Sequence, residues 1–378
     1  MLHRIFPLLT VAILSACGGG GANAPAEHPQ EQHAVPLRDA IDAIIVPYMS
    51  SNGMSAATIS ILKDGVPLYE HGYGFQNAAH SVALPANALF RTASLIKPVT
   101  AAAIQKLAAQ GKLSMSDHAF CVGNKQPCWL PATLLSATTD ARAKDITVGQ
   151  LIEHKGGWDT TISGNIDTME ATIRDALGKS GPPNRDEIVR FGMARPLDFT
   201  PGARSAYSTF GYMLLGQIVE AVTKTSYLQY AQENIMGPLG ISAADFKQAH
   251  SLLAERDARE PNYLSTLMWP SAFNPGKSAL AMDEGALMEN WTAGAGTLAS
   301  AHAMALFAAN YRLPDGVPLA GSHNDGAKNG DVPGASTVMR QLPSGVSYAL
   351  FINANGSFSD EQGPFLKQID AAIAASLK

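Results

Sequence analysis

The sequence predicts an α+β fold in which an antiparallel β-sheet is built from both chain ends, flanked by helices, with a mainly helical insert. Alternating apolar residues around tight turns occur near one end, at 56–72, and again near the other, at 336–352. The long middle instead has apolar residues at helical spacing, separated by turns rich in Gly and Pro. The simplest architecture is therefore one sheet shared by both ends, with the middle inserted as a helical region.

Composition and charge narrow the class of protein. With 46% hydrophobic and 16% charged residues, the 378-residue chain has the balance of a soluble globular protein with a large core. The net charge of -5, without a dense Lys/Arg run, gives no basic surface for nucleic acid. We expect residues 36–378 to form a single domain, with the helical insert at about 121–290.

A targeting segment is predicted at the N-terminus. His3 and Arg4 form a short basic region, and the 12 residues Ile5–Ala16 are mainly apolar but too few to span a membrane, which takes about 20. Leu14-Ser15-Ala16-Cys17 resembles a bacterial lipoprotein signal. That resemblance implies cleavage before Cys17 and lipidation of its thiol.

The processed protein is then expected to be anchored by lipid in the bacterial cell envelope. Gly18, in place of an acidic residue, indicates the outer membrane, with the protein facing the periplasm. Residues 1–16 would be the signal peptide and residues 17–35, which contain several Gly and Pro, a flexible tether. The alternative is an ordinary secretory peptide that happens to contain Cys.

The elements of the first 111 residues follow from apolar spacing. Pro36–Met49 has the helical pattern, and Ala56–Lys63 and Val66–Gly72, joined by a two-residue turn, predict a β-hairpin. Leu95–Leu107 predicts a further helix, for which Gly111 offers a C-terminal stop.

Later segments complete the pattern. Residues 336–341 and 346–352 predict a second hairpin, and Phe365–Leu377 an amphipathic last helix. The helices expected in the middle of the chain are Ile146–Glu153, Ile188–Met193 and Phe210–Thr223.

Cys121 and Cys128 are the two cysteines left after processing. Export to an oxidising compartment favours a disulfide between them, across a short loop that contains Gly123 and Pro127. Two thiols without nearby His or carboxylate ligands make a poor zinc site, and no metal is expected there.

The segment Ser94-Leu95-Ile96-Lys97 carries the strongest chemical signal, because it places a hydroxyl and an amine one helical turn apart. Residues i and i+3 share a helix face, with Cβ atoms roughly 5 to 6 Å apart, so the Lys97 amine can take the Ser94 proton. A helix N-terminus also stabilises a developing oxyanion. The alternative is a Ser N-cap on an ordinary core helix.

A second Ser-x-x-Lys match lies at Ser60 and Lys63. It falls within the predicted strand 56–63, where residues i and i+3 point to opposite faces of the sheet. We interpret this copy as structural.

Two further segments carry candidate site residues. Tyr207 stands in a turn before the 210–223 helix, and a phenol becomes a usable base if nearby ammonium groups lower its pKa from about 10. Lys328-Asn329-Gly330 is, by itself, a polar turn before a strand. Taken alone, Tyr207 is compatible with an ordinary packing residue as well as with a site residue. Lys328-Asn329-Gly330 is likewise compatible with a solvated turn.

Together these segments resemble the serine β-lactamase and penicillin-binding-protein superfamily, most closely its class C-like esterase and peptidase branch. Ser94 and Lys97 match the Ser-x-x-Lys element, and Lys328-Asn329-Gly330 matches the Lys-Thr-Gly element apart from its middle residue. The resemblance runs from about Ile41 to Leu377 and includes 146–154 and 293–298.

The resemblance implies a role for each residue. Ser94 would be the nucleophile, Lys97 its activator, and Tyr207 the base that passes the proton to the leaving group. Lys328 would bind a substrate carboxylate or tune Tyr207, with Asn329 and Gly330 in the same substrate-binding element. The backbone N–H groups of Ser94 and Asp331 would form the oxyanion hole.

One position departs from the family. The second motif often reads Tyr-x-Asn, whereas this chain has Tyr207-Ser208-Thr209. The Asn amide normally helps to position an acylamide side chain, and the Thr209 hydroxyl has a shorter reach and fewer donors. The departure favours an esterase or peptidase over an efficient β-lactamase.

The sequence therefore predicts a serine hydrolase that acts on small ester, amide or peptide substrates through an acyl-enzyme on Ser94. A β-lactamase or D,D-carboxypeptidase is the alternative within this chemistry, and a non-catalytic peptidoglycan- or protein-binding module is the alternative outside it. The chain contains no Gly-x-Ser-x-Gly, His-Glu-x-x-His or P-loop motif. We expect no cofactor.

Overall fold

The computed structural model describes residues 29–313, 326–355 and 363–377. The predicted signal peptide, Cys17 and the first part of the tether lie outside the described residues. No described helix is both long enough and apolar enough to cross a membrane.

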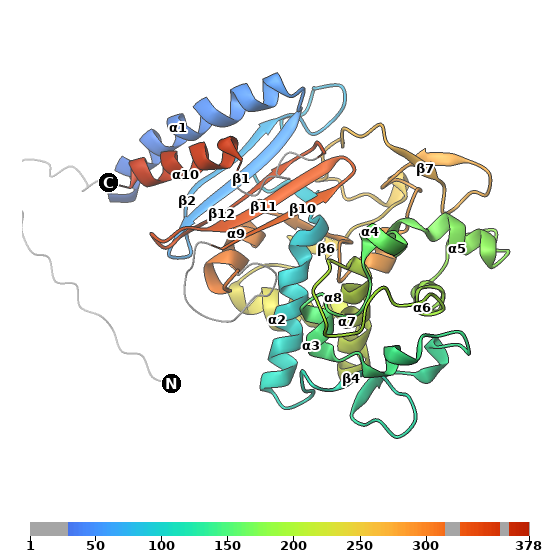
Figure 1. Ribbon diagram of the computed structural model, residues 1–378. Coiled ribbons are helices and arrows are strands. Elements are labelled where there is room, and N and C mark those ends of the chain that lie inside the picture. The colour runs from blue at the N-terminus through green and yellow to red at the C-terminus, as the bar shows by residue number, and fades with distance from the viewer. Residues whose placement is uncertain (1–28, 314–325, 356–362, 378) are drawn as a thin grey trace, which may run out of the picture.

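Within the described chain, one antiparallel sheet joins the two ends, in the strand order β10-β11-β12-β1-β2 (Figure 1). The central pair sets Thr58 opposite Phe351 and Ser60 opposite Ala349. This confirms the predicted α+β class. The strands of the sheet are β1 (Ala56–Lys63), β2 (Val66–Gly74), β10 (Ala327–Val332), β11 (Ala335–Gln341) and β12 (Val346–Ile352).

Each face of the sheet packs against helices, because alternate side chains of its central strands point to opposite sides. Ile59 and Ile61 of β1 join Leu350 of β12 in one apolar cluster with the helices α1 (Pro29–Ser51) and α10 (Pro364–Ser376). The other face, including Phe351, packs into the larger core with α9 (Ala301–Asn310). The central strands β11, β12 and β1 are thus buried, with helices on both faces of the sheet (Figure 1).

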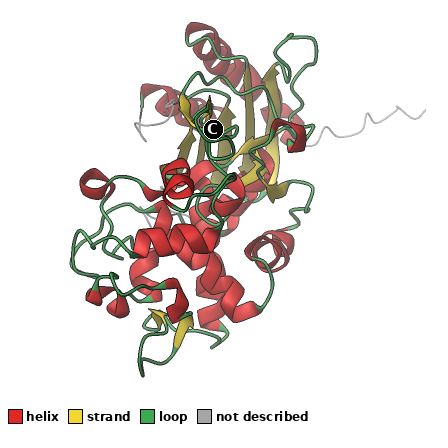
Figure 2. Ribbon diagram, turned by 90° about the vertical axis from the view of Figure 1, so that its right-hand side faces the viewer, coloured by secondary structure: helices red, strands yellow, loops and turns green. Residues whose placement is uncertain are grey.

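The middle of the chain forms the helical region beside the sheet, with short strands among its helices (Figures 1 and 2). Its helices are α3 (Val148–Ile152), α4 (Thr160–Ser163), α5 (Glu170–Ala176), α6 (Arg185–Met193), α7 (Thr209–Thr223) and α8 (Tyr227–Ala231). Its short strands are β4 (His118–Phe120), β5 (Cys128–Leu130), β6 (Phe246–Gln248), β7 (Met268–Pro270) and β8 (Ser278–Leu280).

A second small sheet, which the sequence did not predict, leads into the segment around Ser94. It has the order β3-β9-β6 and pairs β3 (Leu89–Arg91) with β9 (Thr297–Ser300) and β9 with β6. After β3 the chain enters the helix α2 (Ile96–Ala109). Strands of three or four residues are too short for their apolar alternation to stand out in a sequence.

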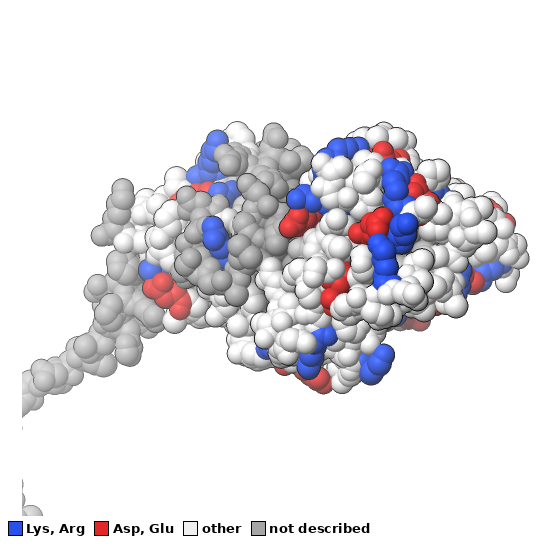
Figure 3. Space-filling view, turned by 60° about the horizontal axis from the view of Figure 1, so that its bottom comes forward, with Lys and Arg blue, Asp and Glu red and all other residues white. Residues whose placement is uncertain are grey.

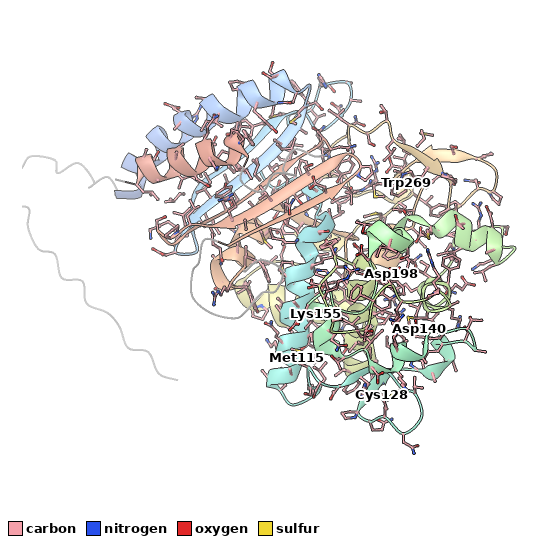
Figure 4. All side chains as sticks on the ribbon, in the orientation of Figure 1. Met115, Cys128, Asp140, Lys155, Asp198 and Trp269 are labelled. Atoms are coloured by element: carbon pink, nitrogen blue, oxygen red, sulfur yellow. A yellow bond between two sulfur atoms is a disulfide. The ribbon has the colours of Figure 1, made fainter. Side chains whose placement is uncertain are left out.

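The sulfur atoms of Cys121 and Cys128 lie 2.13 Å apart, in the pairing expected from the sequence. The pair joins the end of β4 to the start of β5. Figure 4 places Cys128 at the lower edge of the helical region.

Two element boundaries differ from the prediction. Helix α1 begins at Pro29, so residues 29–35 are helical where a flexible tether was expected; Pro is well tolerated in the first turn of a helix. Lys328-Asn329-Gly330 lies inside β10 and not in a turn before a strand. Its polar residues hide the strand, which is defined by main-chain pairing with β11 and not by an apolar pattern.

Charged side chains of both signs are interspersed on the face seen in Figure 3. Such mixing gives no single-sign field to attract a polyanion.

Asn353 joins the two ends of the sheet, and its removal should destabilise the fold. The fully buried Asn353 side chain accepts from the Ala56 backbone N–H at 3.0 Å and donates to the Asn262 carbonyl at 2.7 Å. Asn353→Ala leaves these buried groups without hydrogen-bond partners and should lower the free energy of unfolding by about 2 to 3 kcal/mol. Urea unfolding followed by circular dichroism measures it. Asn310→Ala, at an exposed helix end, is the control and should change it by less than about 0.5 kcal/mol.

Candidate active site

Ser94 lies in a 3₁₀ turn, η1 (Ala93–Leu95), between β3 and α2. Just before it, Ala93 has a φ of 49°, in the left-handed region that non-glycine residues rarely adopt. Thr92 holds this backbone in place, since its N–H donates to the Thr297 carbonyl at 2.9 Å and the two hydroxyls lie 2.6 Å apart. Strain of this kind persists where surrounding contacts over-determine the conformation.

The Lys97 amine lies directly beside Ser94, as the i, i+3 spacing predicts. Its Nζ donates to Ser94 Oγ at 3.0 Å, to the Gly294 carbonyl at 2.8 Å and to Thr209 Oγ1 at 3.3 Å. The side chain is only 2% exposed, and this burial lowers the pKa of Lys97 to about 7. Near neutral pH the amine is therefore able to lose and regain a proton.

Tyr207 also contacts Ser94. It stands just before α7, which Ser208 caps by accepting from the Gly211 N–H, and its hydroxyl donates to Ser94 Oγ at 2.6 Å. Burial raises the pKa of Tyr207, while Lys328 and the hydrogen bond to Ser94 oppose the rise. The Lys97 and Lys328 Nζ atoms lie 4.8 and 5.5 Å from the centre of the phenol ring.

Strand β10 passes close to the backbone of Ser94 at Gly330. A Cβ at Gly330 would lie 2.5 Å from the Thr92 carbonyl oxygen and 2.7 Å from the Ser94 nitrogen. The Thr337 hydroxyl on β11 bridges the same two segments, at 2.9 Å from the Thr92 oxygen and 3.0 Å from the Gly330 oxygen. Only glycine fits this approach, which places the next residue, Asp331, beside the Ser94 turn.

The structure thus brings most of the predicted site residues together. Ser94, Lys97, Tyr207 and Thr209 share hydrogen bonds, and Lys328 joins them through the Tyr207 ring. Asn329 and Asp331 flank Gly330 on β10; the exposed Asp331 side chain accepts from the Ser336 hydroxyl at 2.5 Å.

The family model described as Beta-lactamase matches residues 41–354 of this chain, well over half of its length. This match decides the family. The chain belongs to the Beta-lactamase family.

Solved structures share the fold of this Beta-lactamase-family protein. The D-amino acid amidase from Ochrobactrum anthropi SV3 aligns with a TM-score of 0.63 and 18% identity, over 90% of this chain and 99% of that one. EstCE1, described as a hydrolase with promiscuous acyltransferase activity, aligns with a TM-score of 0.62 and 17% identity over the same shares.

A curated relative is nearer in sequence. Protein flp of Staphylococcus aureus strain MW2 is 30% identical over 211 residues, which are 56% of this Beta-lactamase-family chain and 38% of that protein. The chain thus matches well under half the length of this relative.

Sequence reasoning missed or undervalued two residues at the site of this Beta-lactamase-family protein. His154, at the end of the 146–154 segment, packs its ring 4.6 Å from that of Tyr207 and accepts from the Ser208 N–H at 3.1 Å. Burial, with Lys97 and Lys328 nearby, lowers the pKa of His154 to about 3, so the ring stays neutral. Asp167 is the second of these residues and belongs to no sequence motif. Its charge favours the ammonium form of Lys97 only because the fold brings the two groups near each other.

One group of potential metal ligands occurs among the described residues, formed by His250, Glu255 and Glu289. His250 Nδ1 lies 2.9 Å from a Glu289 oxygen and 3.6 Å from a Glu255 oxygen, and these side chains are 27 to 52% exposed. Ion pairing at the surface accounts for this arrangement. That no metal is needed stays a prediction.

The close approach at Gly330 should make this position intolerant of any side chain. Gly330→Ala forces β10 away from the Ser94 turn and should lower the free energy of unfolding by about 1 to 3 kcal/mol. Urea unfolding measures the loss. Gly181→Ala is the control, because a Cβ there meets no atom within 4 Å. Equal stability of both variants would contradict the tight packing.

Proposed function

We propose that this protein is a serine hydrolase that cleaves esters or amides through an acyl-enzyme on Ser94. One observation carries the proposal: Ser94 Oγ lies 3.0 Å from a buried amine, Lys97 Nζ, and 2.6 Å from a phenol, Tyr207 Oη. A hydroxyl that contacts an amine able to take its proton and a phenol able to donate one is the arrangement of an activated nucleophile.

The first half-reaction follows from this geometry. Ser94 Oγ gives its proton to Lys97 and bonds to the substrate carbonyl carbon, whose oxygen becomes an oxyanion. The Ser94 and Asp331 backbone N–H groups stabilise that charge; the approach of Gly330 to the Ser94 nitrogen supports this role. The bond to the leaving group then breaks, and Tyr207 supplies the proton that the leaving oxygen or nitrogen needs.

The second half-reaction returns the enzyme to its starting state. Water gives a proton to the same basic groups and attacks the acyl carbon. The ester bond to Ser94 Oγ breaks, the carboxylic acid leaves, and Ser94 regains its proton. No other reactant is required.

Small esters, amides or peptides are the proposed substrates, and Lys328 is the proposed partner for a substrate carboxylate. The amidase and EstCE1, which share the fold, support this class. Thr209, where the family often has Asn, disfavours efficient β-lactam hydrolysis. Turnover of a chromogenic cephalosporin and of a D-Ala-D-Ala peptide separates β-lactamase and D,D-carboxypeptidase from the proposed activity.

Lipid anchoring at Cys17, in the outer membrane facing the periplasm, remains part of the proposal. It rests on the Leu14-Ser15-Ala16-Cys17 segment and on the basic and apolar residues before it. Metabolic labelling with a fatty-acid analogue tests it, since Cys17→Ser should abolish the label.

The nucleophile is tested by adduct formation. The full chain, purified in detergent and treated with a fluorophosphonate, should gain one phosphonyl group on Ser94 Oγ with loss of fluoride, as measured by intact-mass spectrometry. Ser94→Ala should lose the adduct while keeping its unfolding midpoint.

The second Ser-x-x-Lys copy supplies the matched control. Ser60 lies on β1, is buried, and donates to Glu70 at 2.7 Å, so Ser60→Ala should keep the adduct. Folded wild-type protein without any adduct would favour a non-catalytic binding module instead.

The rate of labelling should depend on pH through Lys97. Because burial lowers the pKa of Lys97 to about 7, the amine is neutral above that pH and accepts the Ser94 proton. Below it the ammonium form cannot, so the rate constant should approach a tenfold fall per pH unit, which is about 50-fold from pH 7 to 5. Labelling stopped at timed intervals between pH 5 and 9 gives the rate constants. The range in which they fall with falling pH is the acid limb of the pH–rate profile. A flat profile would contradict a proton-accepting role for Lys97.

A further inference from the structure

Asp167 carries a buried carboxylate oxygen close to the site. It lies in a 3₁₀ turn of the helical region, η4 (Ile166–Thr168), between α4 and α5. Its Oδ1 atom is buried without a hydrogen-bond partner. Burial raises the pKa of Asp167, whereas the charge of Lys97 and contacts with the Thr209 hydroxyl and the Asn165 side chain favour its ionised form. The pKa of Asp167 is raised overall, and the charge of Lys97 is the largest influence that opposes the rise.

The Thr209 hydroxyl lies between the Lys97 amine and the turn that carries Asp167. Thr209 Oγ1 accepts from Lys97 Nζ at 3.3 Å, and Thr209 begins α7, which packs against the η4 turn. Thr209 is itself held from behind, because a Cβ at Gly294 would lie only 2.8 Å from its methyl group. Lys97 and Thr209 thus share a hydrogen bond, and the charge of Asp167 acts on Lys97 from the helical region.

The charges around Lys97 show why a carboxylate is needed there. Lys328 on β10 has the same sign as Lys97 and also faces Tyr207, while His154 after α3 is neutral. The phenols of Tyr207 and of Tyr212 on α7 lie against the amine with their pKa raised by burial, so they are neutral as well. Of the described ionisable groups, Asp167 is the one whose charge favours the ammonium form of Lys97.

We propose that Asp167 is a positioning residue of this reaction, which acts through the Thr209 hydroxyl to hold the Lys97 amine in place and to set its charge. The proposal rests on the function proposed for Ser94. An amide at position 209, as the family often has, donates to its neighbours without adding charge. In this chain position 209 carries the smaller Thr hydroxyl, and the Asp167 carboxylate lies nearby. We infer that Thr at position 209, in place of the family's Asn, works together with Asp167, which lies 42 positions earlier in the chain.

Asp167→Asn tests the proposal, because it removes the charge and keeps the shape. A negative charge raises the pKa of whichever group accepts the Ser94 proton, whether Lys97 or Tyr207, so its loss lowers that pKa. The acid limb of the fluorophosphonate labelling rate, measured on the full chain between pH 5 and 9, should move to lower pH by about one unit. A purely structural role would leave the limb in place.

Asp198→Asn is the matched control. Asp198 is also a partly buried carboxylate of the helical region, labelled in Figure 4, but it accepts from the Asp159 N–H at 2.7 Å and the Ser163 hydroxyl at 2.8 Å. Its loss should leave the acid limb at the wild-type pH.

Variants at Thr209 keep the proposal testable if Asp167→Asn does not fold. Thr209→Val removes the hydroxyl that favours the ionised carboxylate, and should shift the limb in the same direction; Thr209→Ser should restore the wild-type limb. An unshifted limb in folded Asp167→Asn or Thr209→Val, with wild-type protein labelled normally, would overturn the role of Asp167. Wild-type protein that is not labelled at all would instead overturn the proposed function.

Discussion

The burial of one amine, that of Lys97, is the constraint on which the site depends. An ammonium group taken out of water is costly unless acceptors surround it. Ser94, the Gly294 carbonyl and Thr209 supply those acceptors, from the η1 turn, from the loop before β9 and from α7. Three segments distant in the chain must therefore converge for the protein to bury this side chain. The same convergence brings a hydroxyl into contact with a group that can take its proton.

The main sheet and the helical region each contribute a different part of the site. The sheet supplies β10, whose Gly330 lies against the backbone of Ser94. The helical region supplies Tyr207, whose hydroxyl donates to Ser94, and Asp167, whose charge favours the ammonium form of Lys97. Ser94 itself stands where the two parts meet, on the turn that leads from the small second sheet into α2. Neither part alone contains a complete site.

Features that neighbouring residues in the chain determine were predicted well, whereas features that depend on distant segments were not. The hairpin of β1 and β2 and the last helix follow from apolar periodicity, which the chain carries within a few residues. The Ser94 to Lys97 spacing is local in the same way, and the structure places the two groups 3.0 Å apart. Strand β10 has no such pattern, because its residues serve the site and its pairing is supplied by β11. Its reading as a turn was therefore wrong.

The sequence by itself determined the α+β class, the helical turn that sets Lys97 beside Ser94, and the Tyr207 and Lys328 segments through their resemblance to a family. Only the tertiary structure decided that His154 stays neutral beside Tyr207 and that Asp167 lies close enough for its charge to act on Lys97. The physical reason is that a charge acts through space and through burial. Both effects depend on which segments pack together, and the spacing of residues along the chain does not predict them.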